Sequence, residues 1–530
     1  MIRLYCQDFG KGLRFIEITH VLRICIEPDA NKTTTSDFMN TKTPPNEGNS
    51  SLSSQVPLVV DLDGTLTPTD TLIESVIQLI KKYPGYIFLI FFWLLKGRTH
   101  FKCQVASHVK ISAKNLPYNG PFLDYLRSEK QTGRSIILAT AAHLSIAEKV
   151  ASHLGIFDFV LATDATRNLK GRHKLEAIQE KCGNKFVYAG DSQADIPIWK
   201  AAQAAVLVGV SQKLADAVGQ ATPIEQTFPK GNVGIAVWAK AMRVHQWLKN
   251  LLLFIPLLTA FAFTDLGRIF TMLVAFMAFS LAASATYVVN DLWDIDNDRT
   301  HPRKRHRPFA SAKIPILQGM GVAGVALALA LVLAFAVGIS FFMMLLLYIA
   351  LTSAYSLVLK EYVVMDVLML SLLYTLRILA GSVAVGLVTS SWLLAFSVFM
   401  FCSLALVKRC SELVSLDQIG TKATRGRDYR VTDLTVLWPL GVGSALSAVV
   451  VFGLFINTPE TQAHYATPEL LWLVAMGLIY WLARLWIKTS RGEMHDDPVI
   501  YAITDRGSRM TVLAMVGMML AAHFFKLSSI

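Results

Sequence analysis

The chain has 530 residues, of which 53% are hydrophobic and only 17% are charged, with a formal net charge of +12. Soluble proteins carry about a quarter charged residues, so this composition excludes a wholly soluble chain. Residues 57–230 have the composition of an ordinary globular domain, whereas from Leu251 onward long apolar runs alternate with short basic loops. The excess positive charge is typical of loops in a membrane protein, and with no base-reading motif present we expect no nucleic-acid partner.

Three regions follow from these shifts in composition. Residues 1–55 end in a polar stretch rich in Thr, Ser and Asn and are predicted to be a disordered leader. Residues 56–230 are predicted to form an α/β domain, and residues 231–530 a membrane domain. The six cysteines are scattered without a CxxC pair, so neither a disulfide framework nor a zinc site is expected.

Four short apolar runs in the second region predict buried strands. They cover residues 57–60, 135–139, 157–162 and 186–189, and helical stretches separate them. Strands and helices that alternate in this way predict a doubly wound parallel sheet. Polar clusters follow the strands, and in such sheets ligands bind at the carboxyl ends of the strands.

These polar residues suit phosphoryl transfer. Asp61 is the predicted carboxylate nucleophile and Asp63 the general acid and base. The Thr140 hydroxyl would hold a phosphoryl oxygen, and Lys174 would supply positive charge beside the anionic nucleophile. Oxygen ligands indicate Mg²⁺ as the cofactor, and the predicted metal-binding residues are Asp61, Asp63, Asp191 and Asp195.

The order of these motifs resembles a known superfamily. DxDGT at 61–65, the threonine after a strand, GRHK at 171–174 and GDSxxD at 190–195 are similar to those of haloacid dehalogenase (HAD) superfamily phosphatases. The resemblance covers about 57–225 and implies a helical cap and phosphomonoester hydrolysis. Two alternatives stay open: an inactive copy of the fold, and a regulatory partner without activity.

The insert after the first motif contains the apolar run Tyr-Ile-Phe-Leu-Ile-Phe-Phe-Trp-Leu-Leu at 86–95. Ten residues are too few to cross a bilayer as a helix. One interpretation is a buried helix of the cap. The other is a cap that dips into the membrane surface toward a lipid substrate.

The third region predicts an all-α, polytopic domain of about nine transmembrane helices. The expected spans are 251–265, 270–289, 315–338, 341–358, 363–385, 391–407, 435–456, 469–487 and 510–525. The loops 297–313, 359–362, 408–434 and 488–509 hold about 17 Lys and Arg, whereas the alternate loops hold about one, Arg268, so the basic loops are predicted to be cytosolic. This predicts a multi-pass protein of a bacterial-type plasma membrane, with the α/β domain and both active sites in the cytosol.

The segment that ends the second predicted span combines acid and base. Asp291, Asp294 and Asp298 have the spacing i, i+3 and i+7, which places them on one face of a helix. Three carboxylates that close repel one another unless a divalent cation joins them. The basic residues that follow suit phosphate, so the segment predicts a site for Mg²⁺-diphosphate. The alternative is a charged loop that only sets topology.

The pattern NDxxDxxxD resembles the signature of the UbiA prenyltransferase superfamily, and the resemblance covers about 240–525. It implies Asn290, Asp291, Asp294 and Asp298 as metal ligands, with Asp291 and Asp294 catalytic. The common aromatic prenyltransferases carry a second DxxxD between spans six and seven, whereas this chain has a basic loop there. That difference puts a second metal cluster in doubt.

Four stretches resemble a narrower branch, the decaprenyl-phosphate phosphoribosyltransferases: 243–250, 301–308, 408–412 and 491–498. The branch implies transfer of 5-phosphoribose from phosphoribosyl diphosphate, a phosphorylated sugar donor, to polyprenyl phosphate in the bilayer. The fused phosphatase would then remove the 5-phosphate. The candidate phosphate-binding residues are Lys249, Arg303, Lys304, Arg305, Arg307, Lys360, Arg377, Lys408 and Arg409.

Two rival functions remain at this stage. An aromatic-acceptor polyprenyltransferase fused to a phosphatase of unrelated substrate is the first. The second is a transporter, whose carboxylates should lie near the bilayer midplane on broken helices. The aspartates of this chain instead follow the end of a predicted span.

Overall fold

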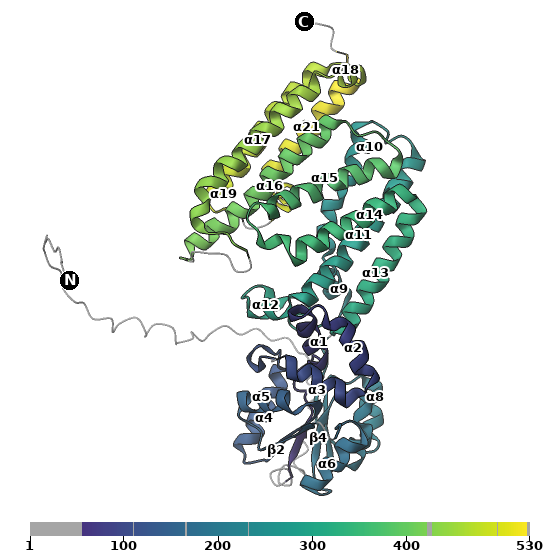
Figure 1. The fold of residues 1–530 in the computed structure, drawn as a ribbon, viewed down its shortest axis with the longest axis vertical. Coiled ribbons are helices and arrows are strands. Elements are labelled where there is room, and N and C mark those ends of the chain that lie inside the picture. The colour runs from purple at the N-terminus through teal and green to yellow at the C-terminus, as the bar shows by residue number, and fades with distance from the viewer. Residues whose placement is uncertain are drawn as a thin grey trace, which may run out of the picture. The chain divides into compact units, whose positions relative to one another are not determined.

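The computed structural model describes residues 56–109, 111–164, 167–231, 233–420, 427–494 and 497–526. The predicted leader, residues 1–55, lies outside the described residues. Figure 1 shows an α/β domain made by the earlier part of the described chain and a domain of long helices made by the later part. Both predicted fold classes are confirmed.

The first domain is built on a six-stranded, fully parallel sheet of order β3-β2-β1-β4-β5-β6. The strands are β1 (Leu58–Val60), β2 (Ile136–His143), β3 (Phe159–Thr163), β4 (Val187–Gly190), β5 (Ala204–Val208) and β6 (Ile224–Phe228). The first four match the predicted strands; the sequence analysis did not identify β5 and β6. The strand order reverses between β1 and β4, which is where doubly wound sheets bind ligands.

Helices cover this sheet and form its cap. Between β1 and β2 the cap consists of α1 (Thr71–Lys82), α2 (Tyr86–Leu95) and α3 (Arg98–His108), followed by the short helix η2 (Ala113–Asn115) and α4 (Gly120–Gln131). The other helices are α5 (Leu144–Leu154), α6 (Arg172–Cys182), η3 (Gln193–Asp195), α7 (Ile196–Ala201) and α8 (Gln212–Gly219). Strand side chains alternate between two cores: Leu58 and Val60 join one, and Val59 joins the other.

Eight described helices of the second domain are long and apolar enough to cross a membrane. They are α11 (Leu266–Trp293), α13 (Ile316–Val337), α14 (Ile339–Leu357), α15 (Met365–Val385), α16 (Ser391–Gln418), α17 (Leu434–Ile456), α19 (Leu471–Ser490) and α21 (Arg506–Phe524). Shorter elements join them: α9 (Ile235–Ala241), η4 (Val244–Phe254), α10 (Ile255–Thr259), α12 (Ile295–Thr300), η5 (Lys304–His306), η6 (Leu359–Glu361), η7 (Val431–Asp433), α18 (Pro459–His464), η8 (Pro468–Leu470) and α20 (Pro498–Thr504).

The prediction of one helical span at 251–265 is wrong. A 3₁₀ helix, η4, ends at Phe254, and α10 adds only five residues. Pro256 lies at the start of α10 and supplies no backbone N–H, so a regular helix cannot continue through it from η4.

This segment nevertheless runs antiparallel to α11 over most of its length. Arg243 pairs with Asp291, the Trp247 indole N–H donates to Ser284, Asn250 donates to Ser280, and Phe254 contacts Phe276. A 3₁₀ helix rises about 2.0 Å per residue and an α-helix about 1.5 Å, so η4 and α10 together extend about 30 Å. That length is close to the thickness of the hydrocarbon core of a bilayer, although the segment is not one regular helix.

Candidate active sites

The first candidate site lies at the carboxyl ends of β1, β2 and β4, as the sequence predicts. Asp61 follows β1, Thr140 belongs to the last half of β2, and Asp191 follows β4. These strands are adjacent in the sheet order β2-β1-β4, so residues that are far apart in the sequence come together at one edge.

Asp61 is buried and paired with a cation. Its Oδ2 accepts a 2.7 Å hydrogen bond from the Lys174 ammonium, and its Oδ1 accepts one of 2.8 Å from the Leu62 backbone N–H. Burial raises the pKa of Asp61, and the adjacent Lys174 opposes that rise. Burial lowers the pKa of Lys174, but Asp61 and Asp195 outweigh it, so the ammonium stays charged. The arrangement suits an ionised nucleophile facing an anionic substrate.

Two further carboxylates lie beside this ion pair. Oxygens of Asp61, Asp191 and Asp195 all lie within 4.8 Å of one another, the one such acidic group among the described residues. Burial, and then the charges of Asp61 and Asp195, raise the pKa of Asp191 to about 7. Mutual repulsion of this kind disappears when a cation binds, and an all-oxygen ligand set fits Mg²⁺. These three residues could therefore hold the predicted ion.

Asp63, also predicted as a metal-binding residue, is not in this group of three. Its Oδ1 accepts a 2.9 Å hydrogen bond from the Thr71 backbone N–H at the start of α1. Burial, reinforced by the nearby Asp70, raises the pKa of Asp63 to about 8. A carboxyl group with that pKa carries a proton near neutral pH, which suits its predicted role as general acid.

The structure adds two residues that the sequence analysis missed. The Tyr188 hydroxyl accepts from Lys174 at 3.0 Å and donates to Asp195 at 2.8 Å, so it links the ion pair to the acidic group. The Thr65 hydroxyl donates to Asp191 at 3.2 Å. Thr65 belongs to the DxDGT motif, and that position was a signal that could have identified it. Thr140, which the sequence analysis did predict, is fully buried, and its hydroxyl accepts a hydrogen bond from the Ala142 N–H.

Gly64 is expected to be essential for this geometry. Its φ is +83°, and a Cβ at this position would overlap the Asp191 carboxylate. Gly133 has a similar φ of +89° but open space around it. Both Ala variants should lose about 1 kcal/mol of stability from backbone strain, whereas only Gly64→Ala should lose most hydrolysis of p-nitrophenyl phosphate. Equal hydrolysis by the two variants would contradict the close approach at Asp191.

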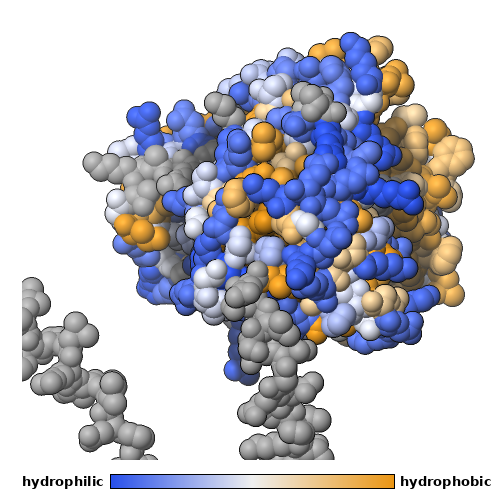
Figure 2. All heavy atoms as spheres, turned by 90° about the horizontal axis from the view of Figure 1, so that it is seen from below, coloured by the Kyte–Doolittle hydropathy of each residue, from blue (hydrophilic) through white to orange (hydrophobic). Residues whose placement is uncertain are grey.

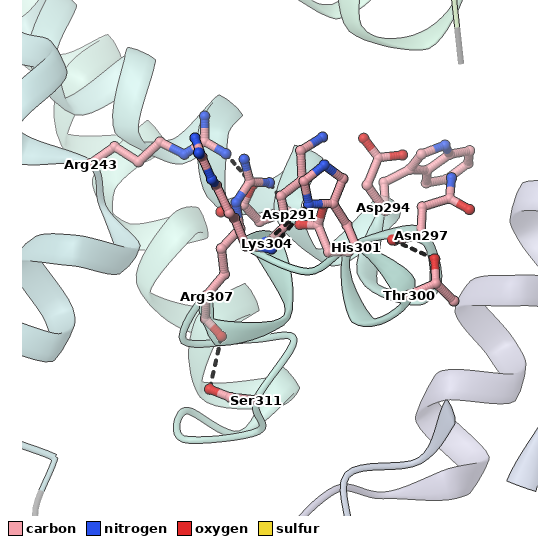
Figure 3. Close-up of polar contacts among 12 residues, drawn as sticks. Arg243, Asp291, Asp294, Asn297, Thr300, His301, Lys304, Arg307 and Ser311 are labelled. Carbon is pink, nitrogen blue, oxygen red and sulfur yellow. Dashed lines mark hydrogen bonds and ion pairs between the residues drawn. The ribbon is translucent and has the colours of Figure 1, made fainter. Parts of the chain in front are cut away.

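The second candidate site lies where α11 ends. The helix stops at Trp293, Asp294 has φ −95° and ψ 12°, and α12 begins at Ile295, so the predicted uninterrupted helix is broken at Asp294. Asp291 and Asp298 still share a face, because Arg307 pairs with both, at 3.1 and 2.7 Å. Figure 3 shows Arg243, Lys304 and Arg307 close to Asp291, with Asp294 farther along the same segment.

Each predicted carboxylate of this motif has a basic partner. Arg243 also pairs with Asp291, and the Lys360 ammonium lies 3.2 Å from Asp294. Asp291 and Asp298 are buried, whereas Asp294 and Asn290 are partly exposed. Carboxylates are suitable Mg²⁺ ligands, and Arg side chains that pair with them are suitable for phosphate. The end of α11 could therefore hold Mg²⁺ and a diphosphate together.

Arg243 is a site residue that the sequence analysis did not select. It adopts a left-handed backbone, with φ +51°, immediately before η4. Non-glycine residues in this region are uncommon and concentrate at functional sites. Its position in the stretch 243–250, just before an apolar crossing segment, was the available signal.

The other predicted phosphate-binding residues divide into separate groups. Arg303, Lys304 and Arg305 are exposed in the loop after α12. Lys249 and Lys408 both pair with Asp497, at 2.6 and 3.3 Å. Arg377 lies deep among the helices, where it donates to Tyr348 and Asn250. A small cavity adjoins the second group, lined by Leu370, Tyr374, Leu404, Ala405, Lys408, Asp497 and Pro498.

Arg409 lies in a buried ionic network. Its Nε is 2.6 Å from Asp366, and it also pairs with Glu412. The Tyr429 hydroxyl donates to Asp366 at 2.5 Å. Both Arg409 and Asp366 are almost fully buried. This arrangement favours a structural role for Arg409, in addition to the predicted role in phosphate binding.

Removing Arg409 should therefore destabilise the membrane domain. We expect Arg409→Met to lower the free energy of unfolding by about 3 kcal/mol, because Asp366 would be left as a buried, uncompensated charge. The exposed Arg303→Met should change it by less than about 0.5 kcal/mol. Denaturation of the purified full chain in detergent micelles would measure both. A loss of transferase activity without any loss of stability would instead support direct phosphate binding.

Comparisons with known proteins match the two domains to two families. Residues 252–503 match the UbiA prenyltransferase family, and residues 58–200 match haloacid dehalogenase-like hydrolases. The chain is 36% identical over 460 residues to the uncharacterized protein y4nM of Sinorhizobium fredii, covering 86% of this chain and 88% of that one. It is 37% identical over 278 residues to nodulation protein NoeC of Azorhizobium caulinodans, covering 52% of this chain and 90% of NoeC.

A third relative has a named activity. The chain is 30% identical over 297 residues to decaprenyl-phosphate phosphoribosyltransferase of Mycolicibacterium smegmatis, covering 54% of this chain and 92% of that enzyme. The relatives, the eight apolar helices and the parallel sheet together identify a multi-pass membrane transferase fused to a hydrolase. The chain thus belongs to the UbiA prenyltransferase family, in the lineage that includes the decaprenyl-phosphate phosphoribosyltransferases, and carries a haloacid dehalogenase-like hydrolase domain at its N-terminal side.

Proposed function

We propose that the membrane domain transfers 5-phosphoribose from phosphoribosyl diphosphate to a polyprenyl phosphate, and that the hydrolase domain then removes the 5-phosphate. The observation that carries the proposal is the end of α11, where Asp291, Asp294 and Asp298 each lie against Arg or Lys. The likeness to phosphoribosyltransferases supports the choice of donor and acceptor. We place the basic loops and both sites on the cytosolic face, on the basis of the charge asymmetry between loops.

In the transferase site, Asn290, Asp291, Asp294 and Asp298 would hold Mg²⁺, which would neutralise charge on the diphosphate. Arg243, Arg307 and Lys360 would exchange their carboxylate partners for phosphate oxygens as the donor binds. An oxygen of the acceptor phosphate attacks C1 of the ribose, the bond from C1 to diphosphate breaks, and diphosphate leaves. Cations already held at this place would stabilise the leaving group without reorganisation.

Lys249 and Lys408 are proposed to bind the acceptor phosphate. Both ammonium groups reach Asp497, and Lys408 and Asp497 line the cavity beside α15 and α16. Two cations around one carboxylate leave a net positive charge for a phosphate monoester. The apolar side chains Leu370 and Leu404 of the same cavity suit the first units of an isoprenoid chain.

In the hydrolase site, Asp61 is proposed to attack the phosphorus of the 5-phosphate and form an aspartyl-phosphate. Asp63 would protonate the departing 5-hydroxyl and then accept a proton from the water that hydrolyses the intermediate. Lys174 and Thr140 would hold the phosphoryl oxygens. Mg²⁺ at Asp61, Asp191 and Asp195 would reduce repulsion between nucleophile and substrate.

The decisive experiment incubates the purified full chain with Mg²⁺, phosphoribosyl diphosphate and a polyprenyl phosphate, and weighs the lipid by mass spectrometry. We expect a lipid heavier by a pentose, with the phosphopentose as an intermediate. No change in the lipid would overturn the proposal. Product formed only from a prenyl diphosphate and an aromatic acid would favour the aromatic-acceptor alternative.

A further inference from the structure

Helix α2 of the cap exposes an unusually apolar surface. Seven of its ten residues are large hydrophobics that are exposed by 42 to 74%: Ile87, Phe88, Leu89, Phe91, Phe92, Leu94 and Leu95. None of its ten residues is buried. Soluble proteins rarely leave a continuous apolar patch of this kind uncovered, and such patches mark interaction sites.

One face of α2 already has a partner. Tyr86, Ile90 and Trp93 follow the spacing i, i+4 and i+7, and they pack against a small core of Leu79, Phe101, Val105 and Val109 from α1, α3 and the turn after α3. The helix is thus fixed on the cap by one stripe, and the rest of its circumference points outward. The interpretation of α2 as a buried cap helix is wrong for these outward residues.

The residues around α2 carry only positive charge, which suits a negatively charged surface. From Ser75 to Leu123 the sequence contains no Asp or Glu, and Lys82 and Lys96 lie just before and just after the helix. Flanking Lys and Arg side chains are attracted to anionic lipid head groups, while the apolar side chains of the helix can enter the boundary of the acyl chains. The seven cations of this stretch are Lys81, Lys82, Lys96, Arg98, Lys102, Lys110 and Lys114.

A bilayer is also within reach. Only six residues, 229–234, separate β6 from α9, and such a linker extends about 20 Å at most. Arg243, which follows α9 closely, reaches the end of the membrane-crossing helix α11. Most of the hydrolase surface visible in Figure 2 is hydrophilic. A bilayer would therefore bind the apolar surface of α2 more favourably than the face shown there.

We propose that α2 inserts into the membrane surface and anchors the cap of the hydrolase domain on the lipid. The helix lies in the interface and does not cross it, because ten residues extend only about 15 Å. Its neighbours α1 and α3 line a cleft with Ala142 and His143, which follow Thr140 on β2. Insertion of α2 would therefore place this cleft, and with it the access to the catalytic edge of the sheet, at the level of the lipid head groups.

The test uses the full chain in vesicles of phosphatidylcholine and phosphatidylglycerol. The six native cysteines are replaced by Ser or Ala, and a polarity-sensitive NBD fluorophore is attached at Phe91→Cys or, separately, at Leu95→Cys. Lys213→Cys, on the exposed side of α8, is the matched control. Hydrolysis of p-nitrophenyl phosphate confirms that each labelled protein is folded.

We expect lipids with a nitroxide near the top of the acyl chain to quench both α2 labels several-fold more than the control, and dissolved iodide to quench them less. Strong iodide quenching at α2 would overturn the proposal, because the helix would then face water. Protection from both quenchers would also overturn it, since a second copy or another protein segment would then cover α2. Neither result depends on the substrate of the transferase.

Discussion

Replacing Asp61 by Asn should convert the final product of this chain into its phosphorylated precursor. The amide side chain of this variant could not form the aspartyl-phosphate, so hydrolysis of the 5-phosphate should fall by roughly three orders of magnitude or more. Transfer should continue at the rate of the unmodified protein, because no proposed transferase residue belongs to the hydrolase domain. Mass spectrometry of the lipid should show phosphopentose in place of pentose.

Asp124→Asn is a suitable control for this variant. Asp124 is an exposed carboxylate on α4, and its contact is a surface ion pair with Arg127. Surface pairs of this kind contribute little, so hydrolysis and transfer should both be unchanged. If Asp61→Asn still yielded only the dephosphorylated lipid, the hydrolase domain would have another substrate.

The catalytic edge of the sheet was predictable because chain order determines it. Each polar cluster directly follows an apolar strand, and parallel strands place such residues at one edge. Asp61 and Asp191 are therefore positioned by the strands that precede them, and Thr140 by the last half of the strand that contains it. Tyr188 lies inside a strand, and its link between Lys174 and Asp195 depends on side-chain packing that strand order does not specify.

The membrane domain shows what apolar runs cannot specify. Hydropathy identifies eight long helices among the described residues, because each contains a long apolar stretch with few charged residues. It cannot distinguish a 3₁₀ helix from an α-helix, so the pattern of η4 predicts an ordinary span. The sequence also could not predict the partners of individual basic residues. Arg307 and Arg409 both come from basic stretches, yet Arg307 pairs with the aspartate motif while Arg409 is buried against Asp366.

The largest effect on transfer is expected from Asp291→Asn. Asp291 is buried, and both Arg243 and Arg307 pair with it, so the substitution removes a proposed metal ligand and alters the position of two proposed phosphate-binding groups. We expect transfer to fall about 100-fold or more at fixed Mg²⁺, as for other losses of preorganised charge at an active site. Higher Mg²⁺ should restore part of the rate.

Asp296→Asn provides the control, because Asp296 lies in the same segment but outside the NDxxDxxxD pattern. It should keep most of the transfer activity. Hydrolysis of p-nitrophenyl phosphate by the same preparations reports whether the chain has folded, so loss of transfer alone cannot be ascribed to unfolding of the whole protein. Equal losses in both aspartate variants would instead indicate that the segment acts only through its overall charge.

A mixture of the Asp61→Asn and Asp291→Asn proteins distinguishes two routes for the intermediate lipid. It could diffuse through the bilayer to another molecule, or it could pass between the two sites of one molecule. The first variant makes the phosphorylated lipid and the second retains the hydrolase. If the lipid diffuses in the shared bilayer, the mixture should form the dephosphorylated product, because α2 would hold each cap at the surface where the lipid phosphate lies. Product from the unmodified chain but none from the mixture would require transfer of the intermediate within one molecule.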